Sequence, residues 1–352
     1  MKETEKIEIM HFSQEGYVED GKNVYEAGKK MTALADKVAD EGYDAVFLMG
    51  VGGTWDELMQ LEYLMNKFGD RDLEVYLIHA AEWNVMGHKR MTEKSVVLTA
   101  SESGTTPEVL EAVKKMKGMG VRVYAMTKPE GPIGQAVGAE NCVAWLLTMV
   151  RAAARRATTS PTASACACST AAAASPSSIC LSSRPRTSGR TCSISASASS
   201  RAPRSSPRST PWPPTPCSSA PALWGETILF SMCILEEMQW KRTRYITSAD
   251  FFHGTLELVE PGVPVFLFMG EDENRKLDER VRAFLTRGVT GDTDINIIDT
   301  AEFAIPGLDD EFRVIVSPWI LTVLVTDRLA RYYETVTKHN LKYRRYYHQF
   351  DY

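Results

Sequence analysis

An alternation of buried strands and amphipathic helices, joined by short loops, constrains the fold of this chain more than any other feature. Before residue 150, the pattern predicts strands at residues 43–50, 74–80, 95–101 and 121–127 and helices at 56–68 and 107–117. After residue 221, it predicts helices at 224–240, 273–287 and 320–338 and strands at 263–270 and 294–299. This order is typical of parallel sheets with helices on both faces. We therefore predict an α/β fold with two domains, each a flavodoxin-like three-layer sandwich.

Residues 151–220 interrupt this pattern, because they use only ten amino-acid types and contain no Asp, Glu, Lys, Phe, Tyr, Val, Met, His, Asn or Gln. Such a composition is typical of a disordered linker, yet linkers usually contain Glu, Lys and Gln. Ala, Arg, Pro, Ser, Thr and Cys are also what GC-rich DNA encodes when it is read out of frame. We interpret residues 151–221 as out-of-frame translation, a hypothesis that the coding DNA can test, and expect them not to form native core.

The chain of 352 residues is long enough for two domains of ordinary size. We place an N-terminal helical arm at residues 1–40, a first domain at 41–150 and a second domain at 222–338. A polar C-terminal tail follows at 339–352. Because the anomalous tract replaces the segment before residue 222, we expect the first strand of the second domain to be disrupted.

The charge and the cysteines exclude several classes of function. The anomalous tract carries nine arginines and no acid, so the rest of the chain has a formal charge of −14, against −5 for the whole. An acidic body argues against nucleic-acid binding. Only Cys142 and Cys233 lie outside the tract, which leaves no disulfide framework and no metal-binding spacing. The apolar runs are too short or too broken for a membrane span, and we expect a cytoplasmic protein.

The segment TASESGTTPEVLEAV (residues 99–113) predicts an anion site, because hydroxyl side chains and a glycine separate a buried strand from a helix. Ser101, Ser103 and Thr106 can donate hydrogen bonds there, and the free N–H groups and dipole of a helix N-terminus favour a negative charge. The absence of Lys argues against a nucleoside-triphosphate loop and favours a sugar monophosphate. The alternative is that Thr106 is only an N-cap before Pro107.

The segment MGVGGTW (residues 49–55) forms a second turn between a strand and a helix. Gly53 lets the backbone approach a ligand closely, and Thr54 supplies a hydroxyl. This turn is a weak signal alone, since glycines there often serve only the turn. Two such loops at the carboxyl ends of neighbouring parallel strands share one crevice, which strengthens both interpretations.

Glu237 and His253 are the candidate catalytic residues. Glu237 falls on the apolar side of its predicted helix, in a row with Phe230 and Ile234, where a partly desolvated carboxylate could act as a general base. His253 lies in FFHG, between aromatic residues and a glycine. The alternatives are a salt-bridged interior acid and a core histidine with satisfied hydrogen bonds.

These motifs together resemble the double sugar isomerase (SIS) domain family. Three features carry this resemblance: the motif SxSGxT after a strand, the earlier glycine loop, and a glutamate separated by fifteen residues from a His-Gly pair. EEMQW…FFHGTLELVEPGVP and the tail HN…RRYY…DY are most similar to the fructosamine-6-phosphate deglycases of that family, which act on fructoselysine or glucoselysine 6-phosphate. The resemblance covers about residues 40–150 and 222–352.

The resemblance implies a deglycase that releases glucose 6-phosphate and a free amino acid without a metal or an organic cofactor. Ser101, Ser103 and Thr106 would bind the phosphate, with Gly53 and Thr54 beside them. Glu237 would move a proton between C1 and C2 of the sugar.

The resemblance assigns three further residues and a homodimer. His253 would assist ring opening or proton transfer at O5, and Arg344 and Arg345 lie in a tail that closes over the site. Family members are dimers whose sites take residues from both chains. Two alternatives remain, an aldose–ketose isomerase on the same fold and a non-catalytic sugar-phosphate-binding protein.

Overall fold

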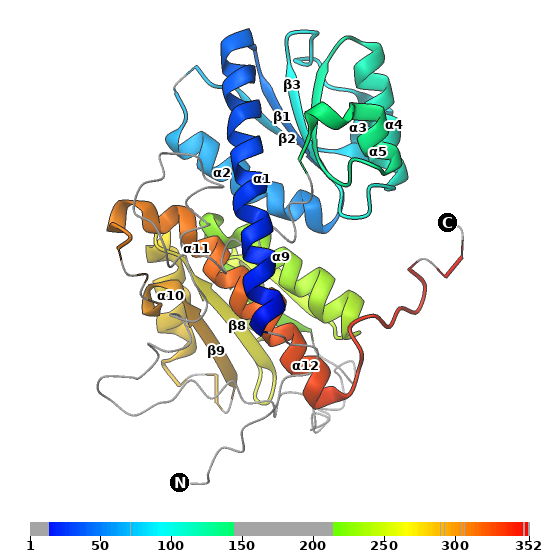
Figure 1. Ribbon diagram of the computed structural model, residues 1–352. Helices are drawn as coiled ribbons and strands as arrows, with labels where there is room; N and C mark the ends of the chain where they lie inside the picture. Colours follow the sequence, from blue (N-terminus) through cyan, green and yellow to red (C-terminus); the bar gives the residue numbers. More distant parts are fainter. Residues whose placement is uncertain are drawn as a thin grey trace.

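The computed structural model describes residues 14–143 and 214–350, except residues 71, 289, 292, 304, 306 and 348. The first part forms a five-stranded parallel sheet in the order β2-β1-β3-β4-β5 (Figure 1). The strands are β1 (Val46–Gly50), β2 (Val75–His79), β3 (Val96–Ala100), β4 (Arg122–Met126) and β5 (Cys142–Val143). The first four coincide with the strands predicted from the sequence.

Helices cover both faces of this first sheet. They are α1 (Gln14–Glu41), α2 (Gly53–Phe68), α3 (Ala80–Met86), α4 (Pro107–Gly118) and α5 (Pro132–Val137). Phe47 and Met49 of β1 pack against α3, α4 and α5, whereas Val46 and Leu48 pack against α2. Successive side chains of a strand point to opposite faces, so the wholly apolar β1 is buried on both sides.

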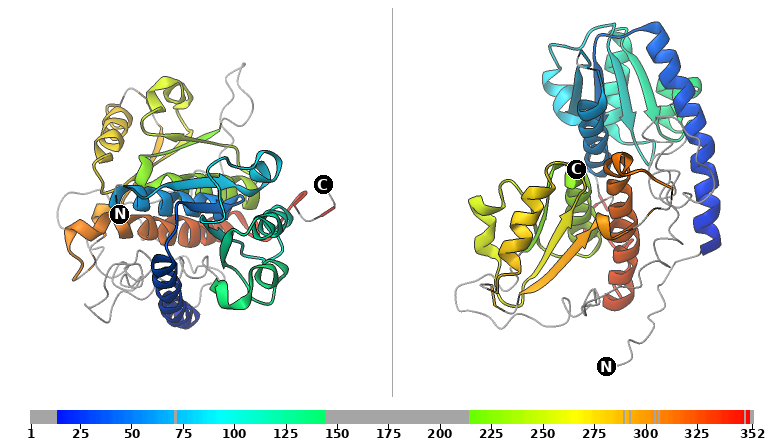
Figure 2. Two further views of the ribbon diagram at one scale, coloured as in Figure 1. Left: turned by 90° about the horizontal axis from the view of Figure 1, so that it is seen from above. Right: turned by 90° about the vertical axis from the view of Figure 1, so that its left-hand side faces the viewer.

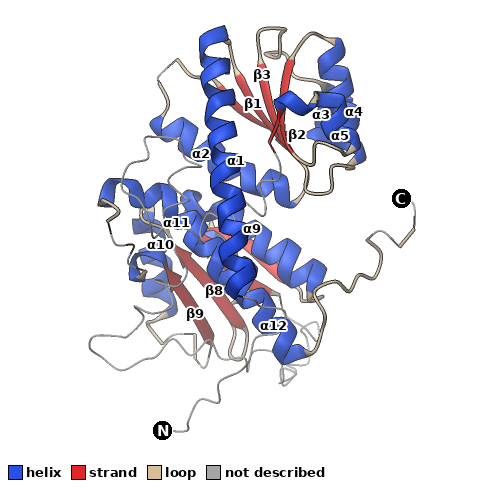
Figure 3. Ribbon diagram, viewed as in Figure 1, coloured by secondary structure: helices blue, strands red, loops and turns tan. Residues whose placement is uncertain are grey.

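The second part forms a four-stranded parallel sheet in the order β7-β6-β8-β9 (Figure 3). Its strands are β6 (Thr215–Ser219), β7 (Thr243–Thr247), β8 (Pro264–Met269) and β9 (Asp294–Asp299). Two parallel sheets flanked by helices confirm the predicted α/β fold.

The helices of the second half also lie on both faces of their sheet. They are α9 (Trp224–Leu229), α10 (Arg275–Leu285), α11 (Arg313–Leu321) and α12 (Ala330–Thr337), with π-helical segments η4 (Phe230–Met238) and η9 (Thr322–Leu329). Phe266 and Phe268 face η4 and η9, whereas Val265 and Leu267 face α10. Short 3₁₀ turns lie at η1 (Ala139–Asn141), η3 (Pro221–Leu223), η5 (Phe251–His253), η6 (Thr255–Leu258), η7 (Thr300–Glu302) and η8 (Asp310–Phe312).

Strand β6 corrects the expectation that the first strand of the second domain is disrupted. Thr215–Ser219 is buried and hydrogen-bonded to β7 on one side and β8 on the other. Pro216 is tolerated in this inner strand because pairing with β8 begins only at Cys217, so the missing proline N–H breaks no bond on that side. Ser219 accepts a hydrogen bond from Thr227 at 2.6 Å. Small side chains are therefore enough to form this inner strand. The rest of the tract, through residue 213, lies outside the described residues.

The two halves are joined by antiparallel packing of α2 on α9 and η4. Gly53 at the start of α2 lies against Cys233 of η4, whereas the Asp56 carbonyl one turn later meets Gly225 at the start of α9. When the Gln60 side-chain amide is oriented so that both its oxygen and its nitrogen have partners, its oxygen accepts hydrogen bonds from the N–H groups of Gly225 (3.1 Å) and Glu226 (3.2 Å). An α2 side chain thus serves the free N–H groups at the α9 N-terminus.

The long helix α1 extends from the first half along the outside of the second (Figures 1 and 2). Lys30 donates to the carbonyl of Ala139 at 3.3 Å, and Met31 packs beside α2. At the end of α1, Glu41 forms an ion pair with Arg122 of β4. None of the helices in the described part of the chain is both long and apolar enough to cross a membrane.

Replacing Gly225 with alanine should weaken the contact between α2 and α9. A Cβ atom there would lie 2.0 Å from the Asp56 carbonyl oxygen, so the helices must separate. Overpacking of this kind costs about 1–3 kcal/mol, which we expect as a loss in the free energy of unfolding measured with urea.

Gly28 provides the matched control, because a Cβ there meets nothing within 4 Å and the residue is also helical. Gly28→Ala should raise the free energy of unfolding by about 0.5–1 kcal/mol. Equal stability of the two alanine variants would contradict the close packing of α2 on α9.

Candidate functional site

The loop between β3 and α4 is organised around the buried hydroxyl of Ser101. Its Oγ accepts a hydrogen bond from the Gly104 N–H at 3.2 Å and lies 3.0 Å from Oγ1 of Thr106. Gly104 has φ +72°, which favours glycine, and a Cβ there would lie 3.2 Å from Thr127. Ser101 therefore holds the loop in shape from inside.

Ser103 and Thr105 lie on the exposed side of the same loop. The Ser103 hydroxyl accepts from both the N–H (3.1 Å) and the hydroxyl (2.9 Å) of Thr105. Thr106 is the N-cap of α4 but forms no capping bond with its side chain, which pairs with Ser101 instead. The N-terminal N–H groups of α4 are thus left for another acceptor, the geometry that favours an anion.

The loop after β1 lies at the same edge of the sheet, because β1 and β3 are parallel neighbours. Gly52 has φ +57°, and Thr54 Oγ1 donates to the Val51 carbonyl at 3.0 Å. Gly53 brings its backbone close to the second half of the molecule. A Cβ atom at this position would already be in contact with Cys233 Sγ, at 3.5 Å. The loop after β1 therefore lies directly against η4.

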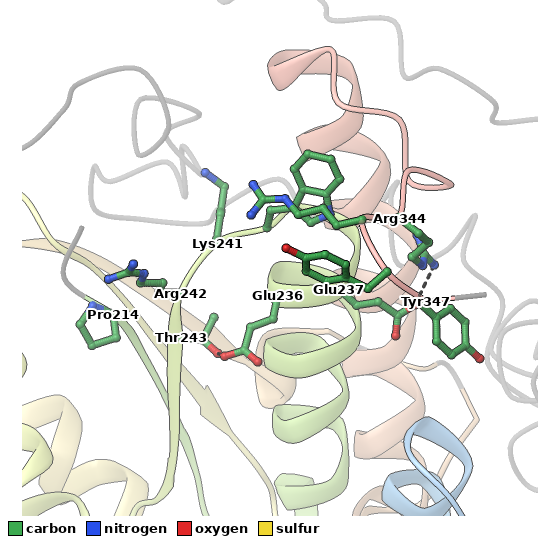
Figure 4. A pocket seen from close by; sticks show the side chains of 11 residues that line it. Pro214, Glu236, Glu237, Lys241, Arg242, Thr243, Arg344 and Tyr347 are labelled. Atoms are coloured by element: carbon green, nitrogen blue, oxygen red, sulfur yellow. Dashed lines mark hydrogen bonds and ion pairs between the residues drawn. The ribbon is translucent and has the colours of Figure 1, made fainter. Parts of the chain in front are cut away.

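Glu237 lies in η4, about one turn beyond Cys233. Phe230 and Ile234 are buried, but the Glu237 side chain is 33% exposed and pairs with Arg344 at 2.7 Å (Figure 4). In an α-helix, Glu237 would lie in the same row as Phe230 and Ile234. Because η4 is wound as a π-helix, Glu237 is turned out of this row toward solvent. The carboxylate is accessible and restrained by a single guanidinium.

The C-terminal tail brings two arginines to this end of η4. Arg344 donates to the carbonyls of Leu341 (2.7 Å) and Tyr343 (2.9 Å) in addition to its ion pair. The guanidinium of Arg345 lies 4.1 Å from the ring centre of Trp240. These contacts place Arg344 and Arg345 in the wall of a cavity of about 810 Å³ that also includes Glu237.

His253 lies elsewhere in the same chain. It ends η5 and is exposed, after the carboxyl end of β7, whereas Glu237 precedes the amino end of that strand. Five residues of strand span roughly 15 Å. Within one chain, Glu237 and His253 therefore lie beyond opposite ends of β7.

Sequence reasoning missed the cations that follow η4. Lys241 and Arg242 line the same cavity as Glu237 (Figure 4). The signal was present as the pair Lys241 and Arg242 directly after the predicted helix, but exposed basic residues at a helix end are common and this pair alone does not predict a site.

Two carboxyl groups are buried between the halves of the molecule. Asp56 of α2 and Glu226 of α9 are 1% and 2% exposed, and Thr326 donates to Glu226 at 3.2 Å. Burial, and then the neighbouring charge of Glu226, raise the pKa of Asp56 to about 8. At neutral pH Asp56 is therefore mainly protonated in the folded chain.

Comparison with known proteins agrees with this architecture. No protein-family model matches the chain. It is 23% identical over 335 residues to the fructosamine deglycase FrlB of Bacillus subtilis (strain 168), covering 90% of this chain and 95% of the relative. It is 24% identical over 333 residues to the fructoselysine 6-phosphate deglycase of Escherichia coli (strain K12), with coverages of 90% and 88%.

Solved structures share the fold. A Bacillus subtilis protein assigned as a phosphosugar isomerase superposes with a TM-score of 0.71 at 20% identity, covering 92% of this chain and 97% of that protein. The tagatose-6-phosphate ketose/aldose isomerase of Escherichia coli superposes with a TM-score of 0.57 at 14% identity, covering 94% and 95%. The chain therefore has the two-domain α/β fold of these proteins.

Substituting Asp56 with asparagine should change how stability depends on pH. The pKa of Asp56 rises from 3.8 to about 8 on folding, so the folded chain retains a proton that the unfolded chain releases between these values. That contribution to stability is complete below about pH 4 and is lost as the pH rises toward 8. The Asp56→Asn variant has no carboxyl group that titrates at this position, so its stability does not fall in this way. The free energy of unfolding of the variant minus that of the parent chain should therefore increase steadily from pH 5 to pH 8. A difference independent of pH, in urea titrations of both proteins, would contradict the burial of this carboxyl group.

Proposed function

We propose that this protein is a deglycase that hydrolyses fructosamine-type 6-phosphates, such as fructoselysine or glucoselysine 6-phosphate, to glucose 6-phosphate and a free amino acid. The observation that carries the proposal is the contact of Gly53 with Cys233, which joins an anion-cradling sheet edge to the helix that presents Glu237. The names of the curated relatives support the same chemistry.

In this proposal the sugar phosphate binds at the loop after β3. The hydroxyl groups of Ser103 and Thr106 and the N-terminal N–H groups of α4 donate to the phosphate, while Ser101 keeps the loop in shape from below. Gly53 and Thr54 form the adjacent wall. Binding of the phosphate at one end fixes the sugar chain relative to the second half of the molecule.

The Glu237 carboxylate acts as the base. It removes a proton from C1 of the open-chain ketosamine, which gives an enaminol, and returns the proton at C2. The resulting imine at C1 is attacked by water, and its C–N bond breaks to leave the aldehyde of glucose 6-phosphate and the free amine. The sum is one substrate and one water converted to two products, so the steps require no redox partner and no cofactor. Arg344 holds the carboxylate in place at 2.7 Å.

We further propose that two copies of the chain complete each site. Glu237 and His253 lie at opposite ends of β7, so a second copy could supply His253 for ring opening or proton transfer at O5. The exposure of His253 supports this arrangement. The substrate is a small phosphorylated molecule, and a homodimer is the expected partner assembly.

Product analysis tests the proposal directly. The chain incubated with fructoselysine 6-phosphate should release lysine and glucose 6-phosphate in equal amounts. Glu237→Gln should reduce kcat at least about a hundredfold, because a positioned base contributes roughly 10²–10⁴, while glucose 6-phosphate still binds in a calorimetric titration.

Glu111→Gln is the matched control, because Glu111 is also an ion-paired helical glutamate but pairs with Lys115 on the surface of α4. Its kcat should stay within about twofold of the parent chain. Interconversion of aldose and ketose phosphates without release of an amine would identify an isomerase instead. Binding of sugar phosphates with no turnover at all would identify a non-catalytic binding protein.

A further inference from the structure

The cavity beside Glu237 lies between the end of η4, the start of β7 and the C-terminal tail (Figure 4). Four cationic side chains line it, those of Lys241, Arg242, Arg344 and Arg345, against only two carboxylates, those of Glu236 and Glu237. The lining therefore has an excess of positive charge. Charge of one sign gathered in a concave site attracts a ligand of the opposite sign.

The two carboxylates do not neutralise this cluster. Glu237 pairs with Arg344, and Glu236 accepts a hydrogen bond from the Thr243 hydroxyl at 2.6 Å. Within the described ranges, no carboxylate lies within ion-pair distance of Lys241, Arg242 or Arg345 (14–143 and 214–350). Three cations thus remain for a bound anion.

Aromatic rings lie beside two of these three cations. The Arg345 guanidinium lies 4.1 Å from the ring centre of Trp240, and the Lys241 ammonium lies 5.6 Å from that of Tyr333. Lys241 is half-buried, and this burial lowers its pKa. An anion placed beside a half-buried ammonium offsets the cost of removing it from water.

The order of the parts gives the direction in which a substrate would lie. The loop after β3 and the Gly53 turn occupy the edge of the first sheet, Gly53 meets Cys233, and Glu237 follows about one turn later. Glu237 is part of the lining of the cavity. In a ketosamine 6-phosphate, the phosphate is on C6 and the amino acid is attached through nitrogen to C1. With the phosphate at the loop and C1 at Glu237, the amino acid therefore extends into the cavity.

We propose that the cluster of Lys241, Arg242 and Arg345 binds the carboxylate of the amino-acid part of the substrate and so selects glycated amino acids over other glycated amines. The inference rests on the proposed deglycase function. Whichever amine is glycated, the amino acid keeps its carboxylate, which is the second anionic group of the substrate. Guanidinium groups match a carboxylate in both charge and geometry.

A pair of substrates that differ only in the carboxylate tests this assignment. Fructoselysine 6-phosphate is compared with the same phosphate attached to 1,5-diaminopentane, which has the lysine chain without its carboxylate. The parent chain should have a kcat/KM at least about tenfold higher for the lysine compound, the range expected for a hydrogen bond to a charged group. Arg345→Gln and Arg242→Gln should each reduce this preference severalfold, by lowering only the value for the lysine compound.

Arg280→Gln is the control, because Arg280 also lies over an aromatic ring, that of Phe252 at 4.2 Å, but belongs to α10. It should leave the preference unchanged. Equal turnover of both compounds by the parent chain would overturn the assignment while leaving the deglycase proposal intact. Equal losses on both compounds in the arginine variants would also overturn it and would assign the cluster to the phosphate. Turnover of neither compound by the parent chain would overturn the deglycase proposal and this inference with it.

Discussion

The contact of α2 with α9 and η4 is the interaction on which the candidate site depends. Each half of the molecule places its loops at the carboxyl edge of its own parallel sheet, and the proposed phosphate loop and Glu237 belong to different halves. Because Gly53 and Gly225 have no side chains, the two helices approach closely and run antiparallel. Glu237 follows about one turn after Cys233, the η4 residue that lies against Gly53 in the turn after β1. The same closeness buries Asp56 against Glu226.

The parts of the site have different physical roles. Ser101 is buried and shapes the loop, whereas Ser103 is exposed and free to meet a ligand. Arg344 fixes Glu237 through one ion pair while also bonding to its own tail. Among the cations beyond Glu237, Lys241 and Arg345 have aromatic partners, and neither has a carboxylate partner among the described residues. In the proposed arrangement, the phosphate, the reacting carbon and the carboxylate of a substrate with anions at both ends each meet a distinct group.

Sequence reasoning predicted the apolar parts of the fold well and the polar parts less well. Strand β9 was predicted at its observed bounds, and β8 within one residue, because long apolar runs bounded by turns leave few alternatives. Strand β7 was missed, since TRYIT is a half-exposed edge strand that follows a basic run. The sequence motifs made Glu237 and His253 candidates together, but they could not show that the two residues lie at opposite ends of β7. Strand β6 was rejected on composition, although backbone pairing on both sides is enough to form it.

A crystal structure of the Glu237→Gln variant with fructoselysine 6-phosphate bound would test the central claim most directly. The account predicts the phosphate at the hydroxyl groups of Ser103 and Thr106 and at the N-terminus of α4. It also predicts C1 and C2 within hydrogen-bond distance, about 3 Å, of the side-chain amide at position 237. A phosphate bound elsewhere, or a sugar whose C1 and C2 lie beyond the reach of that amide, would contradict it.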